Sequence, residues 1–435
     1  MLNITDIRST RRACRAGLFA LLLAAQFACG TKPEAPANPV GTWHGTIKTK
    51  AGEDVAFTLE VANAGQSPAG ITQVTGTLVN GDDRLVSTEG VVNGPSLKLR
   101  YDFYDGVLLA KITGDELHGT FVRQWQKQTL TRELHARRGA AEPVEPSTND
   151  LTGDWVLKVG TGEAQRLWRA SFQTGNGKTA NGQASGTIIP VSGDWGQLSG
   201  TFGKDNVLTL NRFDGINARI FKVTLQPDGT LSGYLDLGLE PKRNVVAERI
   251  NDKNKALVAT LPDPRTYTRM SNASEPFHFK FPDLDGKFVA WDDARFKKKV
   301  VVVSITGSWC PNCHEETPFL QEMYTRYKDQ GLEVVALAFE YTGEIARDLE
   351  QVKIFAKRHG VTYPMLLAGS TDDAKEKLPQ LVNFGAYPTA LFIGRDGLVK
   401  RIHAGFEGRA TGERFTNLKA ETEAVIKDLL SGQEK

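Results

Sequence analysis

The sequence predicts a multidomain protein in which an all-β N-terminal region precedes a C-terminal α/β domain. A chain of 435 residues is too long for one typical domain. Between residues 40 and 250, short runs of alternating apolar and polar residues are separated by turns such as Asn80-Gly81-Asp82. The run from Lys299 to Ile305 is instead apolar apart from Lys299 and Ser304, which is typical of a strand buried on both faces. A net charge of +2 gives no reason to expect nucleic acid as a partner.

Residues 1–28 are predicted to be a signal peptide, followed by a tether at residues 29–39. Four arginines between positions 8 and 15 precede an uncharged apolar stretch, residues 17–28, that is too short to span a bilayer. Cys29 follows a small residue and resembles the lipobox cysteine of bacterial lipoproteins, although Gln26 replaces the usual aliphatic residue. The resemblance implies a lipid anchor on Cys29 at the periplasmic side of the cell envelope. A soluble periplasmic protein is the alternative.

Residues 40–138 and 151–250 are predicted to be two copies of one β module, joined by a linker at residues 139–150. The sequence Gly41-Thr42-Trp43 is echoed by Gly153-Asp154-Trp155, and Leu117-His118-Gly119-Thr120 by Leu231-Ser232-Gly233-Tyr234. Both matches have an offset of roughly 110 residues, as a duplication requires. Each copy is expected to be a β-meander, so the region forms either two small barrels or two halves of one sheet. Chance similarity of glycine-rich β sequence is the alternative.

After a second linker at residues 251–273, residues 274–435 are predicted to fold as an α/β domain with a mixed sheet. The first helix is expected to end at Gly331 and the second at Gly360. The predicted strands are 299–305, 332–339, 363–367, 389–393 and 398–403, and the predicted helices are 310–330, 344–359 and 414–430.

Cys310 and Cys313 are the predicted catalytic residues. The segment from Ser308 to Cys313 directly follows a buried strand and opens a helix, where free N–H groups and the dipole lower a thiol pKa. Two intervening residues keep the second sulfur within reach of the first. We expect Cys310 to be the exposed nucleophile and Cys313 the more buried resolving thiol. The other two cysteines are Cys14 and Cys29, so the mature chain keeps one dithiol.

No metal and no cofactor are predicted beyond the redox-active Cys310–Cys313 disulfide. A structural zinc site needs four ligands, and the chain has no second cysteine pair. A purely structural disulfide is the other alternative. A peroxiredoxin normally carries its nucleophile in Pro-x-x-x-Thr-x-x-Cys, whereas Thr306 lies one place too far from Cys310 and no such proline is present.

Residues from about 274 to the C-terminus resemble the thioredoxin-like proteins of the TlpA/ResA type. The resemblance rests on Trp309-Cys310-Pro311-x-Cys313, on Pro318 inside the following helix, and on Gly385-Ala386-Tyr387-Pro388-Thr389. It implies that Pro388 is the cis-proline facing the active site, which would expose the Tyr387 backbone to an extended substrate. Trp309, Pro311 and Tyr387 are the predicted substrate contacts.

Glu316 is the fourth predicted catalytic residue. Ser304 stands where thioredoxins carry a buried acid, and serine cannot act as a base. The resemblance implies an acidic residue near the cysteines, and Glu316 lies one helical turn after Cys313. A partly desolvated carboxyl group there would exchange protons with the thiols. A solvated surface glutamate is the alternative.

The leading functional prediction is an extracytoplasmic protein-disulfide reductase. The expected clients are exported proteins with oxidised cysteines, and the resemblance implies a membrane electron donor of the DsbD/CcdA type. A disulfide isomerase or oxidase is the alternative within redox chemistry. The alternative from another class is an envelope binding protein whose β modules line a ligand groove with Trp43, Trp125, Trp155, Trp168 and Trp195, although these are more simply core residues.

Overall fold

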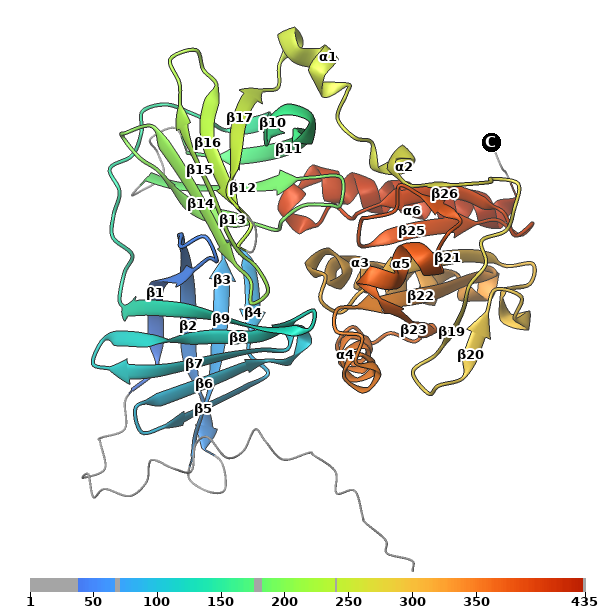
Figure 1. Cartoon of the computed structure of the whole chain (residues 1–435), viewed down its shortest axis with the longest axis horizontal. Helices are drawn as coiled ribbons and strands as arrows, with labels where there is room; N and C mark the ends of the chain where they lie inside the picture. The colour runs from blue at the N-terminus through green and yellow to red at the C-terminus, as the bar shows by residue number, and fades with distance from the viewer. Residues whose placement is uncertain (1–37, 67–70, 176–181, 239–240, 433–435) are drawn as a thin grey trace, which may run out of the picture.

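The computed structural model describes residues 38–66, 71–175, 182–238 and 241–432 (Figure 1). The predicted signal peptide, the lipid-anchor candidate Cys29 and most of the tether lie outside the described residues. Within these described ranges, no helix combines the length and the apolar character needed to cross a membrane. Two β domains lie side by side with the α/β domain, which contacts both of them (Figure 1).

The first β domain is an antiparallel meander that closes on itself. The first strand pairs with the second and with the last, and β3 pairs with both β2 and β5. These pairings close the sheet into a barrel, and β4 flanks it through its hairpin with β3. The strands are β1 (Gly41–Lys48), β2 (Asp54–Gln66), β3 (Thr72–Asn80), β4 (Asp83–Val86), β5 (Glu89–Asn93), β6 (Ser96–Tyr101), β7 (Gly106–Thr113), β8 (Glu116–Trp125) and β9 (Gln128–Arg138).

The second β domain is a closed barrel with the same succession of antiparallel neighbours. Its first strand pairs with both the second and the last. The structure therefore shows two barrels rather than two halves of one sheet. The strands are β10 (Gly153–Val159), β11 (Arg166–Gln173), β12 (Gln183–Ile189), β13 (Leu198–Phe202), β14 (Val207–Phe213), β15 (Ala218–Leu225), β16 (Leu231–Asp236) and β17 (Arg243–Arg249).

One tryptophan occupies the same position in each barrel. Trp43 and Trp155 are 0% and 1% exposed, and each indole N–H donates to the carbonyl oxygen four residues earlier over 2.9 Å. Each ring also lies beneath an arginine of the last strand, Arg138 at 4.4 Å and Arg249 at 4.8 Å from the ring centroid. The predicted repeat is thus confirmed in structure, and both residues belong to the cores, as does Trp195.

Both predicted linkers contain ordered contacts. At the end of the first, the Ser147 N–H donates to the Phe202 carbonyl oxygen over 3.1 Å, so this part packs along the second barrel. The second contains α1 (Lys255–Val258), α2 (Pro264–Tyr267) and β18 (Arg269–Met270). Because β18 pairs with β24 (Leu381–Val382), the end of this segment is attached to the α/β domain.

The α/β domain is built on a five-stranded sheet in the order β23-β22-β21-β25-β26. The neighbours of β22 are parallel to it, while β25 and β26 are antiparallel to their partners. One face packs against α3, α4 and α6, and the other against α5 and the β19–β20 hairpin. The elements are β19 (Lys280–Pro282), β20 (Phe288–Ala290), β21 (Val300–Thr306), α3 (Pro311–Tyr327), β22 (Leu332–Glu340), α4 (Ile345–Arg358), β23 (Met365–Ser370), α5 (Ala374–Lys377), β25 (Thr389–Ile393), β26 (Val399–Ala404) and α6 (Glu413–Ser431).

One strand of this sheet is displaced from its predicted position. The sequence predicts a strand at 363–367, whereas β23 begins at Met365. Pro364 has no N–H group to donate to a neighbouring strand and can only accept hydrogen bonds. Its carbonyl oxygen accepts the Ala336 N–H over 2.9 Å. Regular pairing therefore starts after the proline.

Candidate active site

The two cysteines lie between the end of β21 and the first turn of α3. Cys310 is the N-cap residue and Pro311 the first residue of the helix, a position that needs no N–H donor. The Cys313 N–H donates to the Cys310 sulfur over 3.2 Å. The two residues form a disulfide with their Cα atoms 5.2 Å apart. In the reduced state, the unpaired N–H groups of this first turn would stabilise a thiolate on Cys310.

Cys310 is less accessible than the sequence suggested. Cys310 is 3% exposed and Cys313 is 0% exposed. Cys313 is the more buried of the two, as predicted, but the prediction of an exposed nucleophile is wrong. The side chains of Trp309 and Tyr387 pack against the same core cluster as the two cysteines. Both side chains are themselves only partly buried, so they form the partly exposed surface next to the buried cysteines.

The loop before Cys310 is fixed to the end of β22. Glu340 is fully buried and accepts hydrogen bonds from the backbone N–H and the hydroxyl of Ser308, both over 2.7 Å. The Trp309 indole N–H donates to the Phe339 carbonyl oxygen over 2.8 Å. Burial raises the pKa of Glu340 to about 7. Sequence reasoning missed Glu340, whose one signal was an acidic residue ending an apolar strand.

The loop carrying Pro388 faces the disulfide. The Tyr387–Pro388 peptide bond is cis, as predicted. The Tyr387 carbonyl oxygen lies 3.4 Å from the Cys310 sulfur, and its ring lies 5.1 Å from that of Trp309. The structure therefore brings together Trp309, Cys310, Tyr387 and Pro388 as the sequence predicted.

Glu316 is buried rather than solvated. It is 3% exposed, and its carboxylate accepts the hydroxyl hydrogen of Ser304 over 2.6 Å. Burial raises the pKa of Glu316 to about 7, and the Ser304 hydrogen bond opposes that rise. Ser304 occupies the position of the buried acid of thioredoxins but carries no carboxyl group. The carboxyl group of Glu316, from α3, lies next to it instead. Glu316 and Cys313 lie one turn apart on α3 and are both buried.

The two β barrels contact the active site, which the sequence did not reveal. In the first barrel, Trp125 packs on Tyr341 at 4.3 Å, and Tyr341 stacks on Trp309 at 4.2 Å. In the second barrel, the Ser192 carbonyl oxygen accepts the Asn312 side-chain N–H over 3.3 Å. Asn312 lies between the two cysteines, so the second barrel contacts the active-site loop directly, and the first barrel reaches Trp309 through Tyr341.

The histidines near the site are held neutral. His314 and His359 hydrogen bond to each other over 2.8 Å, and the other ring nitrogen of His314 bonds to the Ser308 carbonyl oxygen. Burial lowers the pKa of His314 to about 3 and that of His359 to about 4. Among the described residues, potential metal ligands gather only on the first barrel, at Glu116, His118 and His135, far along the chain from the cysteines.

Fold and site together define a thioredoxin-like domain whose cysteine pair opens the first long helix. The Redoxin family model matches residues 271–420, which contain this site and leave the β barrels outside the match. The thiol-disulfide oxidoreductase ResA of Bacillus thuringiensis (strain Al Hakam) is 32% identical over 131 residues, 30% of this chain and 68% of that protein. The Geobacillus kaustophilus protein of the same name is 32% identical over 127 residues, 29% of this chain and 66% of that protein.

By this similarity the chain belongs to the ResA family of thiol–disulfide oxidoreductases. Two solved structures are also similar to it. A putative protein disulfide isomerase from Bacteroides thetaiotaomicron is 24% identical, with a TM-score of 0.29 over 39% of this chain and 95% of that chain. A putative thiol:disulfide interchange protein DsbE from Chlorobium tepidum is 22% identical, with a TM-score of 0.29 over 36% of this chain and 99% of that chain.

Proposed function

We propose that the chain is an extracytoplasmic protein-disulfide reductase that works through Cys310 and Cys313. The observation that carries this proposal is the Cys310–Cys313 pair at the N-terminus of α3, with the Tyr387 carbonyl oxygen 3.4 Å from the Cys310 sulfur. This arrangement gives the nucleophile an anion-stabilising helix end and an adjacent backbone against which an extended client can align.

The reaction transfers two electrons from the dithiol to the client. The Cys310 thiolate attacks a client disulfide, forming a mixed disulfide and releasing one client thiolate, which takes a proton from water. Cys313 then gives its proton to the Glu316 carboxylate and attacks the Cys310 sulfur. The Cys310–Cys313 disulfide forms, and the second client sulfur leaves and is protonated. A dithiol donor restores the reduced enzyme, and we assign this role to a DsbD/CcdA-like membrane protein.

The proposed clients are exported proteins with oxidised cysteines, and the proposed location is the periplasmic side of the cell envelope. The basic and apolar N-terminal segment supports export, and the cysteine at its end supports a lipid anchor at Cys29. Pro311 lies beside the disulfide, where a docked client would touch it together with Trp309 and Tyr387.

The direction of electron transfer is tested by equilibrating the full-length chain with glutathione buffers. A reductase has a lower reduction potential than glutathione, so in a buffer poised near about −240 mV we expect the cysteine pair to be mostly disulfide. Acid quenching followed by alkylation and mass spectrometry measures the two forms. A pair that stays mostly dithiol in this buffer would identify an oxidase or isomerase and contradict the reductase assignment.

Replacing Glu316 with glutamine is expected to slow release of the client by about 10-fold to 100-fold at pH 7.5, because Cys313 loses its proton acceptor. The pKa of Glu316 is raised to about 7, so the wild-type rate should rise between pH 6 and pH 8 with a step near pH 7. The variant should lack this step. The measurement is the single-turnover rate at which a Cys310 mixed disulfide is resolved, followed across this pH range.

The free energy of unfolding of the same variant provides a second test, because the direction of its change with pH is set by the pKa of Glu316. The pKa of Glu316 is raised in the folded state, so the folded protein binds this proton more tightly than the unfolded chain. Its contribution to stability is present below the unfolded pKa and is lost as the pH rises through about 7. Glu316→Gln should therefore gain stability relative to wild type between pH 5 and pH 8. A gain in stability without loss of the kinetic step would show that Glu316 is buried but takes no part in proton transfer.

A further inference from the structure

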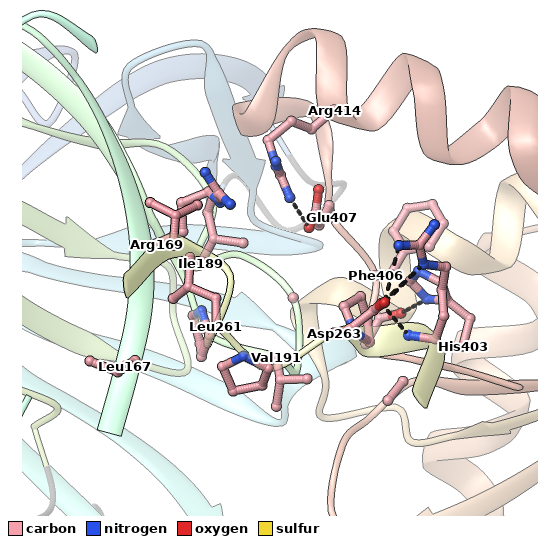
Figure 2. Close-up of a pocket in the computed structure, with 18 of the residues that line it drawn as sticks. Leu167, Arg169, Ile189, Val191, Leu261, Asp263, His403, Phe406, Glu407 and Arg414 are labelled. Carbon is pink, nitrogen blue, oxygen red and sulfur yellow. Dashed lines mark hydrogen bonds and ion pairs between the residues drawn. The ribbon is translucent and has the colours of Figure 1, made fainter. Parts of the chain in front are cut away.

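A cavity of about 300 Å³ lies where the second barrel, the connecting segment and the α/β domain meet (Figure 2). Its walls come from β11, from the end of β12 with the loop after it, from residues 258–265, from β26 with the loop after it, and from the start of α6. Neither cysteine lines it. Its volume is at the lower end of the range in which proteins bind small molecules.

The charges that line this cavity do not cancel. Three arginines and two carboxylates face it. The carboxylate of Asp263 is paired with Arg265 over 3.0 Å, and that of Glu407 with Arg414 over 2.7 Å. The guanidinium group of Arg169 makes no side-chain hydrogen bond or ion pair within the described part of the chain. Among the residues that line the cavity, one positive charge is therefore left over, because burial also lowers the pKa of His403 and keeps that ring neutral; Asp154, outside the lining, opposes it in part.

Arg169 and Arg414 point into the same space from different domains (Figure 2). Burial lowers the pKa of Arg169 and the neighbouring charge of Arg414 lowers it further, while the carboxylates of Asp154 and Glu407 act in the opposite direction. The Arg414 Nε atom is itself buried without a hydrogen-bond partner among the described residues. Buried donors are almost always paired in folded proteins. Two guanidinium groups with open donors therefore converge where an anion would satisfy both of them.

The rest of the wall decides the kind of anion. Leu167, Ile189, Val191 and Leu261 supply apolar surface to the cavity, and Figure 2 shows them grouped on one side of it. The single excess charge matches a monoanion, whereas the carboxylates of Glu407 and Asp263 would repel a dianion such as a phosphate monoester. A carboxylate is planar and suits two guanidinium groups.

We propose that this cavity binds a compact amphiphilic monocarboxylate, with its carboxylate between Arg169 and Arg414 and its apolar part against Leu167, Ile189, Val191 and Leu261. The carboxylate belongs either to a free carboxylic acid or to the C-terminus of an apolar peptide. Because its ligands come from both the barrel and the α/β domain, the occupant holds the two together. The site does not depend on the disulfide chemistry.

The test is calorimetric titration of the full-length chain carrying Cys310→Ser and Cys313→Ser, so that thiol exchange plays no part. The probes are hexanoate and hexanamide, and acetyl-Ala-Leu with a free carboxylate and as its amide. We expect at least one acid to bind, and to bind at least about 10-fold more tightly than its amide. The acid that binds better identifies the source of the carboxylate. Equal affinity of acid and amide, or no saturable binding of either acid, would overturn the proposal.

Variants locate the binding. Arg169→Gln and Arg414→Gln should each weaken the acid by about 10-fold or more, and Arg169→Lys, which keeps the charge, should weaken it less than Arg169→Gln. The matched control is Arg166→Gln on the same strand, because Arg166 is exposed and its side chain bonds, among the described residues, only to backbone carbonyl oxygens. It should bind within about 2-fold of the parent. Binding that is unchanged in Arg169→Gln, with the urea midpoint preserved, would refute the site.

Discussion

Replacing Cys310 with serine is expected to lower the rate of disulfide reduction by at least about 10³-fold, the scale on which removal of a catalytic nucleophile acts. A serine hydroxyl is not ionised near neutral pH, and the helix N-terminus has no thiolate to stabilise in the variant. The measurement is turnover of insulin disulfides with dithiothreitol as the electron source. A variant that keeps a tenth of the wild-type rate would exclude Cys310 as the nucleophile.

Cys313→Ser is the matched control for this assignment. Its Cys310 thiolate still attacks, but no second sulfur resolves the mixed disulfide, so the client should remain covalently attached. Mass spectrometry after incubation with oxidised insulin should find an adduct on Cys313→Ser and none on Cys310→Ser. Equal trapping by both variants would contradict the assigned roles, and trapping by Cys310→Ser alone would reverse them.

Local sequence signals were sufficient to predict the α/β domain. The valine run of β21 predicts a strand buried on both faces, and every residue of the strand is buried. Gly331 and Gly360 adopt positive φ of 102° and 59°, which glycine accepts without strain and which ends the preceding helical segments. The proline of the Pro388 loop lies between a glycine and a strand, and its bond is cis as expected. Each of these features is decided by residues close in sequence.

The barrels were predictable as copies but not as closed structures. The repeated Gly-x-Trp and the matching Leu-x-Gly segments show a duplication because the same contacts recur in both copies. Closure depends on pairing β1 with β9 and β10 with β17, across about a hundred residues of intervening chain. The alternation of apolar and polar residues predicts which face of each strand points inward, but it does not predict which strand pairs with which.

The environment of the disulfide was the part that the sequence could not reveal. Asn312 meets Ser192 across 120 positions of the chain, and Ser308 meets Glu340 across 32. Polar residues of this kind are equally common on solvated surfaces, so no local pattern distinguishes them. For the same reason Cys310 was expected to be exposed, because Tyr387, whose carbonyl oxygen lies 3.4 Å from its sulfur, belongs to a loop distant in sequence.

Replacing Trp155 with alanine is expected to destabilise the second barrel by about 3–5 kcal/mol, the range for removing a large buried aromatic side chain. Trp155 is 1% exposed and packs 6.2 Å from Phe172, centroid to centroid. The variant leaves a cavity, and it deprives the Leu151 carbonyl oxygen of its indole donor and Arg249 of the ring beneath it. Urea unfolding followed by far-ultraviolet circular dichroism measures the change.

Two further variants separate the volume of the Trp155 ring from its hydrogen bond. Trp155→Phe keeps an aromatic ring beneath Arg249 and loses only the indole donor and some volume, so its cost should be well below that of alanine. Val246→Ala on β17 is the surface control, because Val246 is 42% exposed and its truncation should change stability by under about 0.5 kcal/mol.

The repeat predicts the same effect in the first barrel. Trp43→Ala should destabilise that barrel to a similar extent, because the Trp43 indole bonds to the Pro39 carbonyl oxygen and its ring lies beneath Arg138. A loss below about 1 kcal/mol at either tryptophan would mean that the two rings are not equivalent supports of their barrels.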